Sequence, residues 1–345
     1  MNDQLTHLIS ETRFKEITSL FNKLAPLVIV GDVGIDKYTL GEVTRISPEA
    51  PVPILKVNKE WEKLGLAANI GHNLSHLGIE STLCGVIGQD RRAPRFESLL
   101  EEEDLKTWGI VRDPSRPTIF KERITTATQQ ICRIDYEDNI ALGNNISDQV
   151  TERISDFLDN HSGMIIEDYS KGMMTEKLIK DCLSLAKEMN KPVYVDPGLK
   201  TSPVHYKGAT LLKPNLKEAK LMVESLGYTY EEKTVEEMAT ILIDKLDLNQ
   251  IVITLGSEGM ALMEKEIKNS FQVIPTVAQE VYDVSGAGDT TISLLASSLL
   301  TGASLSEAAW IGNCGAGVVV AKKGTATVNL EELTIFYQRL VDRFS

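Results

Sequence analysis

A glycine-rich stretch at residues 283–290 puts a possible anion cradle next to a carboxylate. A helix-forming apolar run, 291–300, follows it, so its small residues fall where a loop enters a helix. Gly286 and Gly288 allow backbone angles closed to other residues, and the unpaired N–H groups of a first helical turn attract anions. Such a pocket suits a phosphoryl group, and Asp289 beside it could accept the proton of an attacking hydroxyl. The alternative is an ordinary capping Asp after a glycine turn.

Other polar side chains follow apolar runs that predict buried strands. In a parallel sheet, ligands gather at the carboxyl ends of the strands, so we expect these side chains to meet at one edge. Asp32 there could bind sugar hydroxyls or simply form a turn. Asn69 offers donor and acceptor groups at the start of a helix. Lys171, near a glycine, could meet a phosphate, although a lone Lys is usually solvated.

Two further motifs favour nucleotide and metal chemistry. Asn215 and Glu218 lie three residues apart at an expected helix start, where they would share one face. Such a pair can hold Mg²⁺ directly or through its waters, but a capping box explains the same residues equally well. The segment 254–259 is a strand end followed by a glycine turn, which can bring backbone N–H groups to a nucleotide phosphate.

The elements that must position these residues alternate between short apolar strands and longer helices. This alternation predicts an α/β fold with a mostly parallel sheet covered on both faces. The predicted strands are 27–30, 82–86, 164–166, 193–195 and 251–255, and the clearest helices are 67–77, 175–189 and 234–246.

Two segments interrupt this rhythm with strand-like alternation, at about 36–58 and 117–135. We expect them to pair as a small antiparallel sheet that forms a lid over the strand ends. Its exposed edges and apolar faces predict a homodimer joined through the lid. Residues 1–25 form a predicted helical extension, with apolar positions at Leu5, Leu8, Ile9, Phe14, Ile17 and Leu20, and the catalytic domain is predicted over 26–345.

The composition of the chain indicates which binding partners it avoids and which cellular compartment it occupies. The net charge of −13 argues against nucleic acid and anionic membrane surfaces as partners. Four scattered cysteines lack metal-type spacing and indicate a reducing compartment. The sequence has neither a signal-peptide pattern nor an apolar run long enough to span a bilayer, so the expected location is the cytoplasm.

In this order and these contexts, the motifs resemble the PfkB/ribokinase family of carbohydrate kinases from about Leu27 to Val328. The resemblance implies a ribokinase-like fold, with ATP and Mg²⁺ as cofactors and a sugar or sugar phosphate as substrate. On the catalytic and nucleotide side it implies Asp289 as base, an anion hole of Gly286, Ala287 and Gly288, Asn215 and Glu218 near Mg²⁺, Thr254, Gly256 and Gly259 along ATP, and Asn313 beside adenine. On the substrate side it implies Asp32, Asp36 and Asn69 at the sugar, with Arg123, Arg133 and Lys171 as candidates for a substrate phosphate.

Within the family, the segments 45–53, 129–135, 168–172 and 324–328 look like the kinases that phosphorylate O1 of D-glycero-D-manno-heptose 7-phosphate on the route to ADP-heptose and lipopolysaccharide. Since the chain stops at Ser345 without a nucleotidyltransferase segment, the stand-alone kinase form is expected. Two positions depart from the family pattern: Leu66 replaces a usual glycine, and Gly198 follows Asp-Pro where a lysine is expected. Both touch substrate contacts, so the reaction class is better defined than the sugar.

Other functions remain open at this stage. Glycine turns after strands also serve dehydrogenases, but Gly31 is not followed by a Gly-x-Gly-x-x-Gly pattern. A kinase for another sugar, or a non-catalytic sugar-phosphate sensor on the same fold, would share most of these motifs. An assay of phosphate transfer with sugar present distinguishes an enzyme from a sensor.

Overall fold

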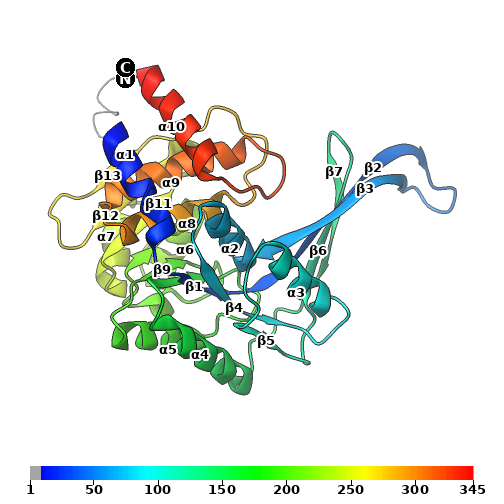
Figure 1. The fold of residues 1–345 in the computed structure, drawn as a ribbon, viewed down its shortest axis with the longest axis horizontal. Coiled ribbons are helices and arrows are strands. Elements are labelled where there is room, and N and C mark those ends of the chain that lie inside the picture. Colours follow the sequence, from blue (N-terminus) through cyan, green and yellow to red (C-terminus); the bar gives the residue numbers. More distant parts are fainter. Residues whose placement is uncertain (1–8, 345) are drawn as a thin grey trace.

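A twisted sheet of nine strands forms the body of the protein, as seen in the computed structural model, which describes residues 9–344 (Figure 1). Its strand order is β13-β12-β11-β10-β9-β8-β1-β4-β5. The strands are β1 (Leu27–Gly31), β4 (Ser81–Ile87), β5 (Ile110–Arg112), β8 (Gly163–Glu167), β9 (Val193–Asp196), β10 (Leu211–Leu212), β11 (Gln250–Thr254), β12 (Met260–Glu264) and β13 (Gln272–Ile274). The first seven of these pair in parallel, and β12 and β13 join antiparallel at one edge.

Helices cover both faces of this sheet, because its central strands are apolar on both sides. In β1, Leu27 and Ile29 pack into one core cluster, and Val28 and Val30 pack into the other. The first cluster takes in α1 (Glu11–Thr18), α2 (Ala67–His76), α3 (Ala93–Glu102), α8 (Ala287–Leu300), α9 (Leu305–Val320) and α10 (Leu330–Phe344). The second takes in α4 (Asn144–Leu158), α5 (Glu176–Glu188), α6 (Leu216–Ser225) and α7 (Val235–Leu246). The predicted α/β fold with a parallel sheet is confirmed.

The second sheet carries the two interrupting segments, and it projects from the body (Figure 1). Its strands are β2 (Val33–Ile46), β3 (Pro53–Leu66), β6 (Ile119–Thr125) and β7 (Gln130–Tyr136), in the order β3-β2-β6-β7. We call this sheet the lid. The predicted small lid sheet is present, but it is mixed and not antiparallel, because β2 and β6 pair in parallel while each flanking pair is antiparallel. Residue alternation defines strands but carries no information on their relative direction.

The N-terminal segment packs against the C-terminal helix. The ring of Phe14 in α1 stacks on Tyr337 of α10 at 4.0 Å between centroids, and the Tyr337 hydroxyl donates to the carbonyl of Ile9. Ile17 is also buried, so the predicted amphipathic face is confirmed for this part. Leu5 and Leu8 lie outside the described residues. A short 3₁₀ turn, η2 (Phe21–Lys23), leads into β1.

The predicted strands and helices are confirmed, with small changes at their ends. α8 starts at Ala287 and not at residue 291, so Asp289 lies in its first turn, and the first lid segment extends to Leu66 and not to residue 58. The cysteine thiols are free: Cys84, Cys182 and Cys314 are buried, and Cys132 is exposed. Within residues 9–344, the helices are all too short or too polar to cross a membrane.

Candidate active site

Asp289 is held in a fixed position by two hydrogen-bond donors from other parts of the chain. Its Oδ2 accepts from the amide of Asn69 at 2.6 Å, and its Oδ1 accepts from the hydroxyl of Tyr169 at 2.7 Å. Asn69 belongs to the first turn of α2, and Tyr169 follows β8. Burial raises the pKa of Asp289 to about 6, although both donors act to lower it. A base with this pKa is ionised at neutral pH yet basic enough to take a proton.

The glycine turn before α8 has the backbone of an anion site. Gly286 caps the helix with φ 83°, which favours glycine, and the N–H of Ala287 donates to the carbonyl of Val284 at 3.2 Å. Asp283 fixes this turn, since its carboxylate accepts the N–H of Ser285 at 2.9 Å and that of Gly324 at 3.0 Å. The predicted turn from loop to helix is present at Gly286, and the role of its N–H groups in binding an anion stays a prediction.

A buried charged cluster that the sequence analysis did not single out lies behind this turn. Lys213 Nζ contacts Asp196 Oδ2 at 2.6 Å, and a side chain on Gly288 would come within 4 Å of both groups. Burial raises the pKa of Glu167 well above its usual value, helped by the nearby Asp196 and Asp289 carboxylates. Burial lowers the pKa of Lys213, but Asp196 and Glu167 outweigh it and raise the pKa, so Lys213 stays charged. One feature of the sequence could have revealed this cluster. Its members Glu167, Asp196 and Lys213 are polar residues at the carboxyl ends of β8, β9 and β10.

A cavity of about 420 Å³ opens on the other side of the turn. It brings together the four residues expected along ATP, Thr254, Gly256, Gly259 and Asn313, and it includes Ala287 and Gly288 of the anion turn. Its remaining walls are largely apolar, from Met260, Val281, Val284, Ala316 and Val320. An apolar cavity that ends at a set of backbone donors suits a nucleotide, with the base in the cavity and the phosphates at the turn.

The pair expected at Mg²⁺ forms the capping box of α6. Asn215 Oδ1 accepts the N–H of Glu218 at 3.0 Å, and Glu218 Oε2 accepts the N–H of Asn215 at 2.8 Å. A parallel bridge between Asn215 and Thr254 places this cap beside the nucleotide cavity. Capping engages one oxygen of each side chain, and the second Glu218 oxygen remains for a cation or its water. This oxygen donor set fits Mg²⁺ held through water.

Asp32 lies buried at the carboxyl end of β1, where its carboxylate anchors a loop. Its two oxygens accept the backbone N–H groups of Lys171 and Met173, each at 3.0 Å. Burial raises the pKa of Asp32 to about 6 against these two hydrogen bonds. Each oxygen retains a second lone pair, so the carboxylate can still accept from a sugar hydroxyl. Gly31 must be glycine here, since a Cβ would lie 2.2 Å from the carbonyl oxygen of Glu167.

One face of the lid contacts the loop beside the anion turn. The hydroxyl of Tyr38 lies 2.6 Å from that of Thr325, and Lys63 donates to the Thr325 carbonyl at 3.2 Å. Thr325 in turn borders Gly286. The alternation of strand residues and the strand register put Asp36, Lys121, Arg123 and Arg133 on this same face. We call it the inner face of the lid.

The inner face carries more cations than its acidic residues neutralise. Arg123 donates to Asp36 at 2.7 Å, and Arg133, directly opposite Arg123, forms a two-pronged pair with Asp135 at 2.8 and 2.9 Å. Lys121 contacts Glu137 at 3.7 Å, and Glu137 also accepts from Lys171, which reaches it from the loop after β8. The structure therefore brings together all the cations expected at a substrate phosphate, and adds Lys63 and Lys121 to them.

The two departures from the family pattern have local structural reasons. Leu66 has φ 59° and ψ −139°, a conformation that residues with a side chain avoid. The family's usual glycine adopts this conformation without strain, whereas Leu66 introduces backbone strain next to Asn69. Gly198 lies against the loop after β8, where a Cβ would come within 2.5 Å of Asp168 and Ser170. A lysine at this position would need a different loop.

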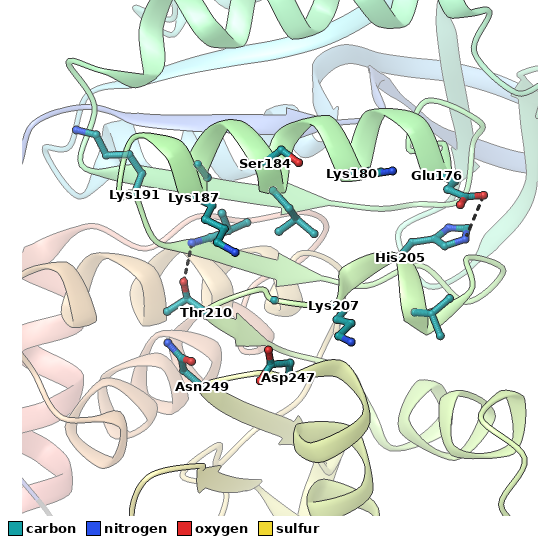
Figure 2. A pocket seen from close by; sticks show the side chains of 15 residues that line it. Glu176, Lys180, Ser184, Lys187, Lys191, His205, Lys207, Thr210, Asp247 and Asn249 are labelled. Atoms are coloured by element: carbon teal, nitrogen blue, oxygen red, sulfur yellow. Dashed lines mark hydrogen bonds and ion pairs between the residues drawn. The ribbon is translucent and has the colours of Figure 1, made fainter.

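A larger cavity of about 640 Å³ lies at the amino ends of the strands, opposite the site around Asp289 (Figure 2). It is bordered by α5, by η3 (Pro203–Tyr206) and by the amino ends of β9 and β10, where Thr210 accepts the N–H of Val193 at 2.9 Å. Since ligands of parallel sheets bind at the carboxyl ends of the strands, the site around Asp289 is the candidate active site despite its smaller cavity.

Comparison with known proteins identifies the family. The model of the pfkB family carbohydrate kinases matches residues 33–333 of the chain. The chain belongs to the pfkB family of carbohydrate kinases. It is therefore a phosphotransferase, and the family predicted from the motifs is confirmed.

The sequence relatives agree with this assignment, and the solved structures show the same fold. This PfkB kinase is 40% identical over 309 residues to the bifunctional protein HldE of Salmonella dublin and 41% identical over 310 residues to that of Psychromonas ingrahamii. These matches cover 90% of the chain but only 62% and 63% of the relatives. The fold is similar to phosphofructokinase-2 of Escherichia coli, with a TM-score of 0.74 at 18% identity over 92% of this chain and 100% of that one. Ribokinase of Arabidopsis thaliana, solved with ribose and ATP, gives a TM-score of 0.68 at 19% identity over 91% and 99%.

Proposed function

We propose that this PfkB kinase transfers the γ-phosphoryl group of ATP to O1 of D-glycero-D-manno-heptose 7-phosphate, a step toward ADP-heptose and lipopolysaccharide, in the cytoplasm. The observation that carries the proposal is the position of Asp289 at the anion turn, between the nucleotide cavity and the inner face of the lid. Similarity to the HldE proteins and the segments typical of heptose-phosphate kinases support the choice of sugar.

In this proposal the sugar hydroxyl attacks the γ-phosphorus of ATP in line with the leaving ADP, and residues of the chain assist the transfer. Asp289 accepts the proton of the attacking sugar hydroxyl, while Asn69 and Tyr169 keep its carboxylate aimed at the substrate. The N–H groups of Gly286, Ala287 and Gly288 stabilise the charge that develops on the phosphoryl oxygens. Lys213 lies close enough to Gly288 to add positive charge to the same place.

The nucleotide side of the site would hold ATP and its metal ion. The adenine lies against the apolar walls of the cavity near Asn313, whose amide donates to the carbonyl of Pro275 at 2.7 Å. Thr254, Gly256 and Gly259 follow the phosphates. Asn215 and Glu218 would hold Mg²⁺ through water, and the ion when bound neutralises charge on the ATP oxygens.

The inner face of the lid favours a phosphorylated sugar over a free one. Lys121, Arg123 and Arg133 of this face and Lys171 have Asp36, Asp135 and Glu137 as carboxylate partners, and Lys63 donates to Thr325 beside the anion turn. A phosphate dianion could replace one of these carboxylates as the partner of an arginine, with the same two-pronged geometry. Asp32, Asp36 and Asn69 are left for the sugar hydroxyls.

The experiment is a coupled assay of ADP release from MgATP with a panel of sugars: D-glycero-D-manno-heptose 7-phosphate, unphosphorylated heptose, fructose 6-phosphate, ribose and adenosine. A strong preference for the heptose phosphate is expected. Activity confined to another sugar would retain the kinase mechanism and reject this substrate. Binding of ATP and sugar phosphate without any ADP release would favour a non-catalytic sensor.

Two lid variants test the phosphate contact itself. Arg133→Ala removes a half-exposed guanidinium, and Lys121→Ala removes an ammonium from the same face. Loss of a charged hydrogen bond of about 1.5–3 kcal/mol predicts a fall in kcat/KM of about tenfold or more with the sugar phosphate. Turnover of the unphosphorylated heptose should change little. Lys37→Ala, on the opposite face of the lid, where Lys37 pairs with Glu60 and Glu122, is the matched control.

We also propose that the lid joins two copies of the chain. Its outer half exposes apolar side chains, namely Val43, Ile46, Val52, Val57 and Ile134. Light scattering at micromolar concentration should give a dimer, and Val57→Lys should shift it toward monomer. The control is Ile267→Lys, which replaces an apolar residue of similar exposure outside the lid. A monomeric wild-type particle would contradict the proposed dimer.

A further inference from the structure

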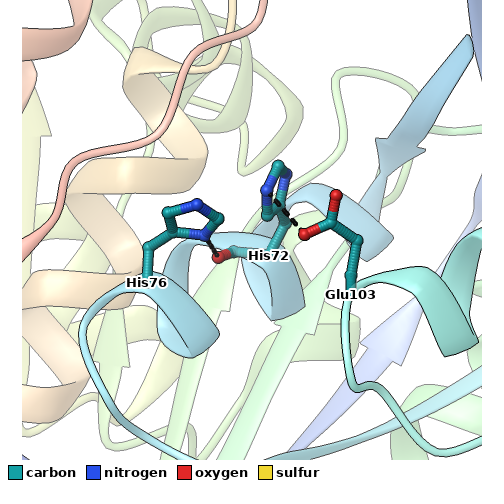
Figure 3. A group of neighbouring side chains, drawn as sticks. All are labelled: His72, His76 and Glu103. Atoms are coloured by element: carbon teal, nitrogen blue, oxygen red, sulfur yellow. Dashed lines mark hydrogen bonds and ion pairs between the residues drawn. The ribbon is translucent and has the colours of Figure 1, made fainter.

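Two histidines and a glutamate meet between α2 and the end of α3 (Figure 3). His72 and His76 are one helical turn apart on α2, and Glu103 caps the end of α3. Each residue offers a ligand atom, and these atoms all lie within 4.8 Å of one another. Histidines four residues apart on a helix with one carboxylate form a donor set that zinc favours.

The distances suit one small cation. His72 Nε2 lies 3.0 Å from Glu103 Oε2. Ligand atoms about 2.0–2.1 Å from a tetrahedral zinc ion are about 3.3–3.4 Å apart, so a small side-chain adjustment makes room. The cation would lie between Nε2 of His72 and Oε2 of Glu103, with the His72 ring protonated at Nδ1.

The second ring is already oriented as in a metal ligand. His76 Nδ1 lies 3.0 Å from the carbonyl oxygen of His72, so it is the protonated nitrogen and donates to this oxygen. This leaves the lone pair of His76 Nε2 free for a cation. Metal-bound histidines usually donate their other ring N–H to a backbone carbonyl or carboxylate in this way.

The charge and exposure of the cluster also favour a cation. His72 is half-buried between α2 and the end of α3, with Nε2 directed at Glu103. The sequence neighbours of Glu103, residues 101, 102 and 104, are also acidic. Lys63 opposes them with one positive charge, which is directed at the carbonyl of Thr325. His76 is exposed, so solvent reaches the site and can supply a water as the fourth ligand.

We propose that His72, His76 and Glu103 bind one Zn²⁺ ion as a structural site separate from the phosphoryl-transfer centre. The ion would fasten α2 to the end of α3. These helices contact the active site in two ways: α2 carries Asn69, which holds Asp289, and α3 carries Arg95, which pairs with Glu62 of the lid at 2.7 Å. The bound ion would therefore brace the base and the lid against each other. This proposal is independent of the sugar that the kinase uses.

The test is a zinc titration of the tag-free protein, first stripped with a chelator, in competition with a chromophoric zinc indicator. Wild type should take up one Zn²⁺ per chain, and the ion should raise its Tm. His76→Gln and Glu103→Gln each remove one ligand. Since loss of even an outer partner of a ligand weakens metal affinity by about 10–100-fold, each variant should lose at least about tenfold.

Two control variants separate this site from adventitious binding. His205→Gln removes a histidine that lies 3.6 Å from a single carboxylate, Glu176, and Cys132→Ser removes the exposed thiol. Both should bind zinc as wild type does. Equal zinc affinity in wild type, His76→Gln and Glu103→Gln, or loss of binding in Cys132→Ser alone, would overturn the proposal.

Discussion

Replacement of Asp289 by asparagine is the sharpest perturbation of the proposed mechanism. The amide keeps the shape of the side chain and can still accept the hydrogen bond that Asn69 donates at 2.6 Å, but it cannot accept a proton. General base catalysis contributes about 10²–10⁴-fold, so turnover should fall by this factor. This fall corresponds to about 2.7–5.4 kcal/mol in the barrier, at 1.36 kcal/mol for each tenfold change.

The pH dependence of the wild type gives the same residue a second signature. Burial raises the pKa of Asp289 from 3.8 to about 6, so the carboxylate becomes protonated as the pH falls through 6. The rate of the wild type should then fall about tenfold for each pH unit below this value. Asp289→Asn lacks this group, so its residual rate should fall less steeply below pH 6, where Asp32 still titrates.

Stability separates loss of the base from loss of the fold. Because the pKa of Asp289 is higher in the folded protein than in the unfolded chain, its contribution to stability is fully present below about pH 4. This contribution is lost as the pH rises through about 6. At neutral pH the buried charge costs up to about 3 kcal/mol, which asparagine avoids. The variant should therefore keep or raise the Tm of the wild type. Near-normal turnover in a folded Asp289→Asn protein, measured by coupled ADP release, would refute Asp289 as the base.

Three further variants test the groups around this base. Tyr169→Phe removes a hydrogen bond that lowers the pKa of Asp289, so the acid limb of the pH–rate profile should move to higher pH; an unmoved limb would contradict this role. Gly286→Ala forces a Cβ into a φ of 83° and to 3.1 Å from the amide of Asn69, so kcat should fall and unfolding should cost about 1–2 kcal/mol less by thermal denaturation; wild-type values for both would count against the turn. Glu218→Gln should raise the Mg²⁺ concentration for half-maximal rate while the KM for sugar stays constant, and an unchanged requirement for Mg²⁺ would exclude Glu218 from the metal site.

Much of the fold and part of the site could be predicted from local sequence. Apolar runs such as 27–30 identify buried strands because both faces of the sheet are covered, and the turn at 283–290 has the residues that its backbone requires. The pairing of β2 with β6 could not be predicted in this way. The chain leaves the lid at the end of β3 and returns to it at β6 after 52 residues, and its direction on return depends on the fold of that segment. Alternation of residues along a strand does not encode strand direction.

The roles of Tyr169 and Lys213 also depend on tertiary structure. Each is an ordinary polar residue after a strand until the sheet brings it next to α8, where Tyr169 meets Asp289 and Lys213 meets Asp196. Leu66 illustrates the opposite case. Its difference from the family pattern is visible in the sequence, but only its φ of 59° shows that the usual glycine has a backbone reason.

Direct observation of the product tests the central claim most directly. The protein would be incubated with MgATP and D-glycero-D-manno-heptose 7-phosphate and followed by phosphorus NMR. We expect ADP and a sugar bisphosphate to form in equal amounts, with the new phosphate coupled to the anomeric proton. Unchanged ATP, or ADP with inorganic phosphate and unmodified heptose phosphate, would contradict transfer to O1 of this sugar.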